Sequence, residues 1–129
     1  MSAYRVTAGL VRTVKDLFAS QPAFDYRLDE IGRFHEGAKH VLYLRPDPAA
    51  RFVTLTEMCV ARWPRLKPYG GAYDEVIPHL TVAEGDAEPS GLSERVGAAL
   101  PIAARADAVW LMTSTRHGGW KAIAILPLG

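Results

Sequence analysis

A histidine and a threonine two positions apart, His79 and Thr81, carry the side chains best suited to chemistry in this sequence. They lie in the run Val76–Ala83, whose alternating pattern predicts a strand. Side chains two apart in a strand point the same way, so the imidazole and the hydroxyl face one spot while Leu80 and Val82 point into a core. An imidazole moves protons and a hydroxyl holds a non-bridging oxygen, and the pair therefore suits chemistry on a phosphate ester.

His79 has either a functional role or an ordinary one, in which the ring is simply satisfied by a backbone carbonyl, and its surroundings add weight to the functional one. Pro78 directly precedes it, and a loop containing Gly70–Gly71 leads into the strand. Small, flexible residues let a ligand approach the backbone closely. Two tyrosines of the same loop, Tyr69 and Tyr73, either stack on a base or pack within the loop, and we take them as substrate-binding candidates.

Two arginines, Arg33 and Arg45, lie near the ends of two early predicted strands, where an arginine either binds an anionic substrate or is solvated. We take Arg33 as the substrate-binding candidate. The remaining histidines, His35, His40 and His117, are interpreted as surface residues beside turns.

Other classes of site find little support in the sequence. No cysteine or paired carboxylate stands at ligand spacing from the histidines, so we expect no metal. Cys59 falls on the apolar stripe of a predicted helix, where a buried inert thiol is the default. Nucleophile elbows, P-loops and dinucleotide fingerprints are absent from the sequence, and we expect no cofactor.

Composition is that of an ordinary globular protein. The 129 residues predict one domain, residues 1–129, with 49% hydrophobic and 22% charged residues. Fifteen lysines and arginines nearly balance 14 acidic residues, so the net charge is too small to attract the protein strongly to nucleic acid or a membrane surface. The single cysteine favours a reducing compartment, and the sequence lacks both a run of the ~20 apolar residues needed to span a bilayer and the apolar block of a secretion signal. We therefore expect a cytoplasmic protein that does not enter membranes.

The elements needed to position His79 alternate along the chain. We predict helices behind Thr7, from Pro48 to Trp63, and over Leu92–Leu100, and strands over 24–34, 41–44, 76–83, 101–105, 109–112 and 120–125. The strands at 24–34 and 41–44 form a hairpin, as do the last two. This order predicts an α+β fold with a mostly antiparallel sheet and helices packed on its face.

The order of these elements, with Pro78-His79-Leu80-Thr81 behind a glycine-rich loop, resembles the 2H phosphoesterase superfamily and, within it, the 2'-5' RNA ligase family. The resemblance runs from about Thr7 to the C-terminus and is most specific over Tyr69–Ala83. It implies two lobes that each contribute a His-x-Thr strand to a cleft. One histidine would act as base and the other as acid on a 2',3'-cyclic phosphate or a 2'-5' linkage, without a metal. His79 and Thr81 match the second motif.

The first motif of that family has no counterpart in this sequence. The nearest candidate is Arg5-Val6-Thr7, which has arginine where histidine belongs, and Thr7 is better interpreted as a helix cap. We therefore expect a family member that lacks the N-terminal strand, or a natural gene product that is longer. A missing strand would leave a sheet edge exposed, through which two copies could pair as a homodimer and bring two His79 residues together.

The resemblance, with only one of the two motifs matched, leaves two candidate functions. The first is an enzyme acting on nucleotides or RNA ends that carry a 2',3'-cyclic phosphate or a 2'-5' linkage, complete when another chain supplies the second histidine. The alternative is a catalytically inactive module that binds nucleotides or RNA ends with half of the cleft.

Overall fold

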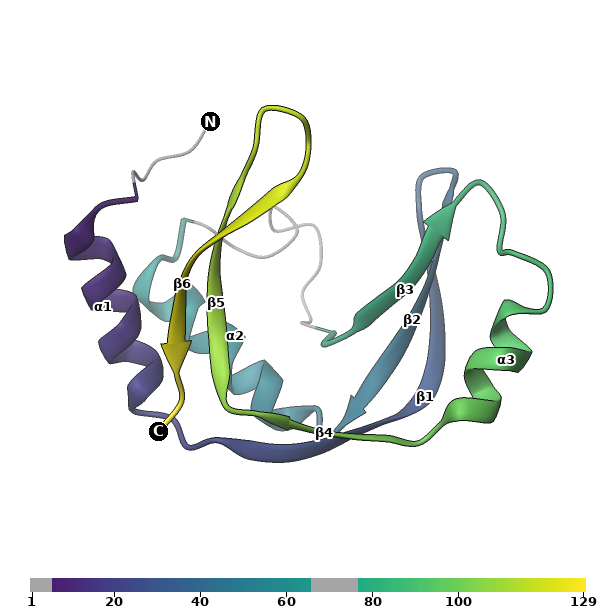
Figure 1. Cartoon of the computed structure of the whole chain (residues 1–129), viewed down its shortest axis with the longest axis horizontal. Coiled ribbons are helices and arrows are strands. Elements are labelled where there is room, and N and C mark those ends of the chain that lie inside the picture. The colour runs from purple at the N-terminus through teal and green to yellow at the C-terminus, as the bar shows by residue number, and fades with distance from the viewer. Residues whose placement is uncertain (1–5, 66–76) are drawn as a thin grey trace. The chain divides into compact units, whose positions relative to one another are not determined.

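The computed structural model describes residues 6–65 and 77–129 and has the α+β architecture that the sequence predicts, with mostly antiparallel sheets (Figure 1). The chain divides into two compact units, which are described separately. One comprises Met1–Phe24 with Arg105–Gly129, and the other comprises Asp25–Ala104. The prediction that residues 1–129 form a single domain stays a prediction.

The unit that contains both termini consists of one helix and one hairpin. Helix α1 (Ala8–Ala19) begins as predicted at Thr7, whose Oγ1 accepts a hydrogen bond of 3.1 Å from the Leu10 amide. Its buried residues Val14 and Phe18 share one face of the helix, which lies along β6 (Trp120–Pro127). Strand β6 pairs antiparallel with β5 (Ala108–Ser114), which confirms the predicted C-terminal hairpin.

The second unit is built on a sheet with the strand order β3-β2-β1-β4. Strand β1 (Phe24–Glu36) and β2 (Lys39–Asp47) form the predicted hairpin, and Gly37 takes the positive φ of 62° that its two-residue turn requires. The two outer strands are β3 (Leu80–Gly85) and β4 (Ile102–Ala106). The residues Val41–Leu44 of β2, which has a strand neighbour on each side, are all buried.

The register of β1 against β2 sets which residues share a face. Asp29 is an extra residue, because Leu28 pairs with Pro46 whereas Glu30 pairs with Arg45. Beyond this bulge, Gly32 and Phe34 lie on the face of their partners Tyr43 and Val41.

Two helices contact the opposite face of this sheet. The ring of Phe52 in α2 (Ala50–Arg62) meets the edge of Tyr26, with 4.9 Å between centroids. Gly97 in α3 (Leu92–Ala99) lies close to the Ile31 side chain. A Cβ at position 97 would lie 3.7 Å from Ile31 Cδ1. The register puts Tyr26 and Ile31 on the same face, so the face bearing Tyr43 is the other one.

The prediction that Leu80 and Val82 point into a core is wrong. Leu80 is 51% exposed and Val82 is 37% exposed. The physical reason is that β3 lies at the edge of the sheet, where a side chain has a strand neighbour on one side only. A second bulge contributes: Leu42 pairs with Ala83 but Tyr43 pairs with Thr81, so Val82 has no directly opposite residue on β2.

None of the helices in the described part of the chain has both the length and the apolar character that crossing a bilayer requires.

Candidate active site

His79 lies one residue before β3, and the sheet register gathers three further side chains on its face. Thr81 pairs with Tyr43, and Leu80 pairs with Leu44. Continuing this antiparallel register by one residue sets Arg45 opposite His79. Imidazole, hydroxyl, phenol and guanidinium therefore share the sheet face that the helices leave free.

A single hydrogen bond decides which nitrogen of His79 carries the proton. Nδ1 lies 2.7 Å from the backbone oxygen of Ile77. A carbonyl oxygen only accepts, so Nδ1 must donate, and the neutral ring then has its lone pair on Nε2. A carbonyl partner is what the ordinary interpretation of this histidine predicts, but it satisfies one nitrogen and leaves the other able to take up a proton.

Two aromatic rings fix the plane of the imidazole. Phe34 meets it edge to face, with 5.4 Å between centroids and 88° between planes, and Tyr43 does so at 5.6 Å and 66°. The two aromatic rings also contact each other at 5.0 Å. Edge-to-face geometry at these separations is favourable beyond the burial of area alone. Tyr43 is only 3% exposed, so this support is rigid.

Gly32 makes room for that support. A Cβ at this position would overlap the ring of Tyr43, its cross-strand partner. The absence of a side chain lets the Tyr43 ring fold across the neighbouring strand. Sequence reasoning missed Gly32, Phe34 and Tyr43 as parts of the site. The available signal was the alternation itself, which puts Gly32 and Phe34 together on one face of β1.

Arg45 supplies a fixed positive charge beside the imidazole. Its Nη2 lies 3.5 Å from the hydroxyl oxygen of Tyr43, its guanidinium carbon lies 5.9 Å from the centre of that ring, and its Nη1 lies 3.9 Å from Glu30 Oε2. The interaction with Tyr43, followed by the charge of Glu30, raises the pKa of Arg45. Its side chain is 53% exposed, so it can bind an anion without leaving these neighbours.

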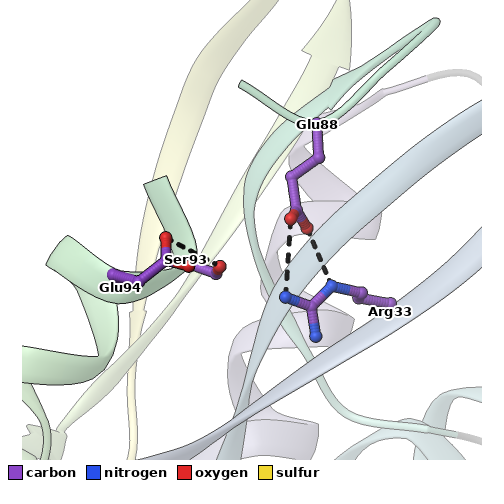
Figure 2. Close-up of polar contacts among 4 residues, drawn as sticks. All are labelled: Arg33, Glu88, Ser93 and Glu94. Atoms are coloured by element: carbon purple, nitrogen blue, oxygen red, sulfur yellow. Dashed lines mark hydrogen bonds and ion pairs between the residues drawn. The ribbon is translucent and has the colours of Figure 1, made fainter. Parts of the chain in front are cut away.

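Arg33, in contrast, is not brought together with His79. It follows Gly32 and precedes Phe34 in β1, so alternation directs it to the opposite face. There its Nε and Nη2 donate to the two carboxylate oxygens of Glu88 at 2.8 and 3.5 Å, as Figure 2 shows. The hydrogen bond to Glu88, and then the charge of that carboxylate, raise the pKa of Arg33. Its role as a substrate ligand stays a prediction.

Of the other predicted residues, those that the structure describes lie apart from this group. Tyr69 and Tyr73 fall outside the described residues. His35 and His40 stand at the tip of the β1–β2 hairpin with their rings 4.5 Å apart, next to a cavity of about 50 Å³ that Arg33 also lines. Cys59 is half-buried in α2, and burial raises the pKa of its thiol. Within residues 6–65 and 77–129 no three His, Cys, Asp or Glu side chains cluster as a metal site would require.

A groove of about 590 Å³ begins next to the histidine. Its walls include Pro78, the residue before His79, and Arg45, the residue opposite it. The described residues that line it are Asp29, Glu30, Arg45, Pro46, Asp47, Ala49, Val53, Ile77 and Pro78.

Comparison with known proteins identifies the family of the chain. Residues 2–118 match the family model described as the 2'-5' RNA ligase superfamily. No curated protein matches the chain. The matched span covers nearly all of the sequence, including the whole of β3 with His79 and Thr81, and it confirms the resemblance drawn from the sequence. The chain belongs to the 2'-5' RNA ligase superfamily, a group of 2H phosphoesterase-like proteins.

Proposed function

We propose that the protein acts on nucleotides or RNA ends bearing a 2',3'-cyclic phosphate or a 2'-5' linkage, in the cytoplasm, by acid–base chemistry that uses no metal. The observation that carries the proposal is the bond from His79 Nδ1 to the Ile77 carbonyl, because it leaves Nε2 ready to exchange a proton. Thr81 on the same face supplies a donor for a phosphate oxygen.

Opening of a cyclic phosphate by water defines what His79 does. Water attacks phosphorus and gives its proton to Nε2, the bond from phosphorus to one ribose oxygen breaks, and that oxygen takes up a proton. Charge on the non-bridging oxygens grows during the attack, and Thr81 and Arg45 are the groups that offset it. In the reverse direction the protonated imidazole is the acid.

Complete turnover needs an acid and a base at the same time, and one imidazole holds only one of these states. A positioned proton-transfer group contributes roughly 10²–10⁴-fold to a rate. We propose that a second copy of the chain, pairing along the exposed sheet edge, supplies the second histidine. Turnover per chain then rises with protein concentration.

The test is cleavage of a nucleoside 2',3'-cyclic phosphate by wild type, His79→Ala and His117→Ala, measured over a range of protein concentrations. His117 is an exposed histidine of the β5–β6 turn and provides the matched control. We expect activity that falls by at least about 10²-fold in His79→Ala and is retained in His117→Ala. Equal rates in the three proteins would refute the proposal, whereas His79-dependent binding without cleavage would identify an inactive binding module.

A further inference from the structure

Among the residues that the structure describes, those lining the groove beside His79 carry a net charge opposite to that expected of a phosphate-binding surface. Asp29, Glu30 and Asp47 contribute three carboxylates, and Arg45 contributes one guanidinium. Arg27 adds a second cation at its margin, 3.3 Å from Asp47 and 3.9 Å from Asp29. The three carboxylates therefore outnumber the two guanidinium groups that contact them.

The two guanidinium groups lie at different places along the groove, and the one next to the histidine is that of Arg45, which contacts Glu30. Extending the register of β2 against β3 by one residue sets Arg45, which lies beside the Tyr43 hydroxyl, opposite His79. Asp47 lies two residues further along β2, where Arg27 pairs with it. One phosphate at His79 and Thr81 therefore meets Arg45. A second phosphate placed further along the groove would meet Asp29 and Asp47, whose two negative charges exceed the single positive charge of Arg27 between them, and this excess repels it at short range.

The rest of the lining suits an uncharged group. Carboxylate oxygens accept hydrogen bonds from hydroxyl and amino groups, which ribose and the bases present. Val53, Ile77 and Pro78 offer apolar surface for the faces of a base, and Ile77 is 43% exposed. The volume of about 590 Å³ falls within the range of roughly 300–1,000 Å³ typical of small-molecule sites.

We propose that this groove, which we call the nucleoside groove (the residues lining the 590 Å³ hollow), binds the ribose and base of a substrate with a single phosphate and disfavours a further phosphate. The inference rests on the proposed function and narrows its substrate to mononucleotides over longer RNA ends. Asp47 and Glu30 are the specificity-determining residues. Asp47 lies on β2 two residues beyond Arg45, and Glu30 lies on β1 directly opposite Arg45.

Equilibrium binding tests the inference without requiring turnover. Calorimetry with wild type and His79→Ala would give dissociation constants for three ligands. These are inorganic phosphate, adenosine 3'-monophosphate, and the adenosine dinucleotide that has a 3'-phosphate in addition to its bridging phosphate. We expect the mononucleotide to bind at least about tenfold more tightly than phosphate through its groove contacts, and the dinucleotide to bind more weakly than the mononucleotide.

A charge-neutralised variant locates the effect. In Asp47→Asn/Glu30→Gln we expect the dinucleotide to bind about tenfold more tightly than it binds wild type, because two repulsive charges are gone. The matched control Glu57→Gln/Asp86→Asn removes the same charge from exposed positions outside the groove and should leave the order of affinities unchanged. Thermal unfolding of both variants checks that they fold.

The outcomes separate this inference from the proposed function. His79-dependent phosphate binding with no gain from the nucleoside, or tighter binding of the dinucleotide by wild type, overturns the nucleoside groove and leaves the proposed site standing. Equal binding of all ligands by wild type and His79→Ala overturns both. An equal response of the two double variants shows a general charge effect and also overturns the inference.

Discussion

The ring of Tyr43 occupies the space in which any residue other than glycine at position 32 would place its Cβ. The same ring contacts the His79 imidazole at 5.6 Å between centroids. A backbone position on β1 is thereby connected to the orientation of a proton-transfer group that it does not touch.

Gly32→Ala should impair catalysis more than it impairs folding. The added methyl must displace the Tyr43 ring, at a cost of about 1–3 kcal/mol for overpacking, and the displaced ring no longer supports the imidazole. We expect a lower melting temperature together with a fall in kcat. Gly85→Ala is the control, because a Cβ at Gly85 meets open space. Normal turnover in a folded Gly32→Ala protein would contradict this role.

The two arginines considered from the sequence should behave differently. Arg45→Gln removes the cation on the His79 face, so KM for a phosphate ester should rise by about 3- to 10-fold. Arg33→Gln breaks the pair with Glu88 on the other face and should leave KM unchanged. Steady-state kinetics on both variants make the comparison, and a larger KM effect from Arg33→Gln would support the prediction that Arg33 binds substrate.

The cap of α1 should contribute to stability without affecting the chemistry. Thr7→Ala removes the acceptor for the Leu10 amide, which should lower the free energy of unfolding by about 0.5–2 kcal/mol. Thr7→Ser keeps the acceptor and should restore most of the loss. Urea unfolding of the three proteins measures these differences in the free energy of unfolding. Indistinguishable midpoints for Thr7→Ala and wild type would show that the cap does not contribute to stability.

Cys59 should react slowly with alkylating reagents at neutral pH. Burial raises the pKa of its thiol, so the reactive thiolate is scarcer than in a free cysteine, and the rate should climb as pH rises beyond the usual thiol range. Alkylation with iodoacetamide, followed by mass spectrometry between pH 7 and 10, tests this. A rate at neutral pH equal to that of glutathione would contradict it.

Local patterns predicted the elements well because their signals are local. The Thr7 cap, the proline and glycine boundaries and both hairpins all follow from a few neighbouring residues. Arg33 and Arg45 have the same strand-end position in the sequence, and the sequence offers no measure of which face a residue takes when a bulge such as that at Asp29 intervenes. The expected burial of Leu80 was wrong because strand order, and hence the position of an edge, is a property of the whole sheet.

The extra residue at Asp29 is a position of β1 that the pairing with β2 does not need. Deleting it would join Leu28 to Glu30, which already pair with the consecutive residues Pro46 and Arg45, so every later side chain would keep its face. Side-chain direction in a strand has a period of two, so deleting Ile31 instead, with the start of β1 anchored, would turn Arg33 toward the imidazole and Gly32 and Phe34 toward the helices. Deletion of Asp29 should therefore be tolerated far better than deletion of Ile31.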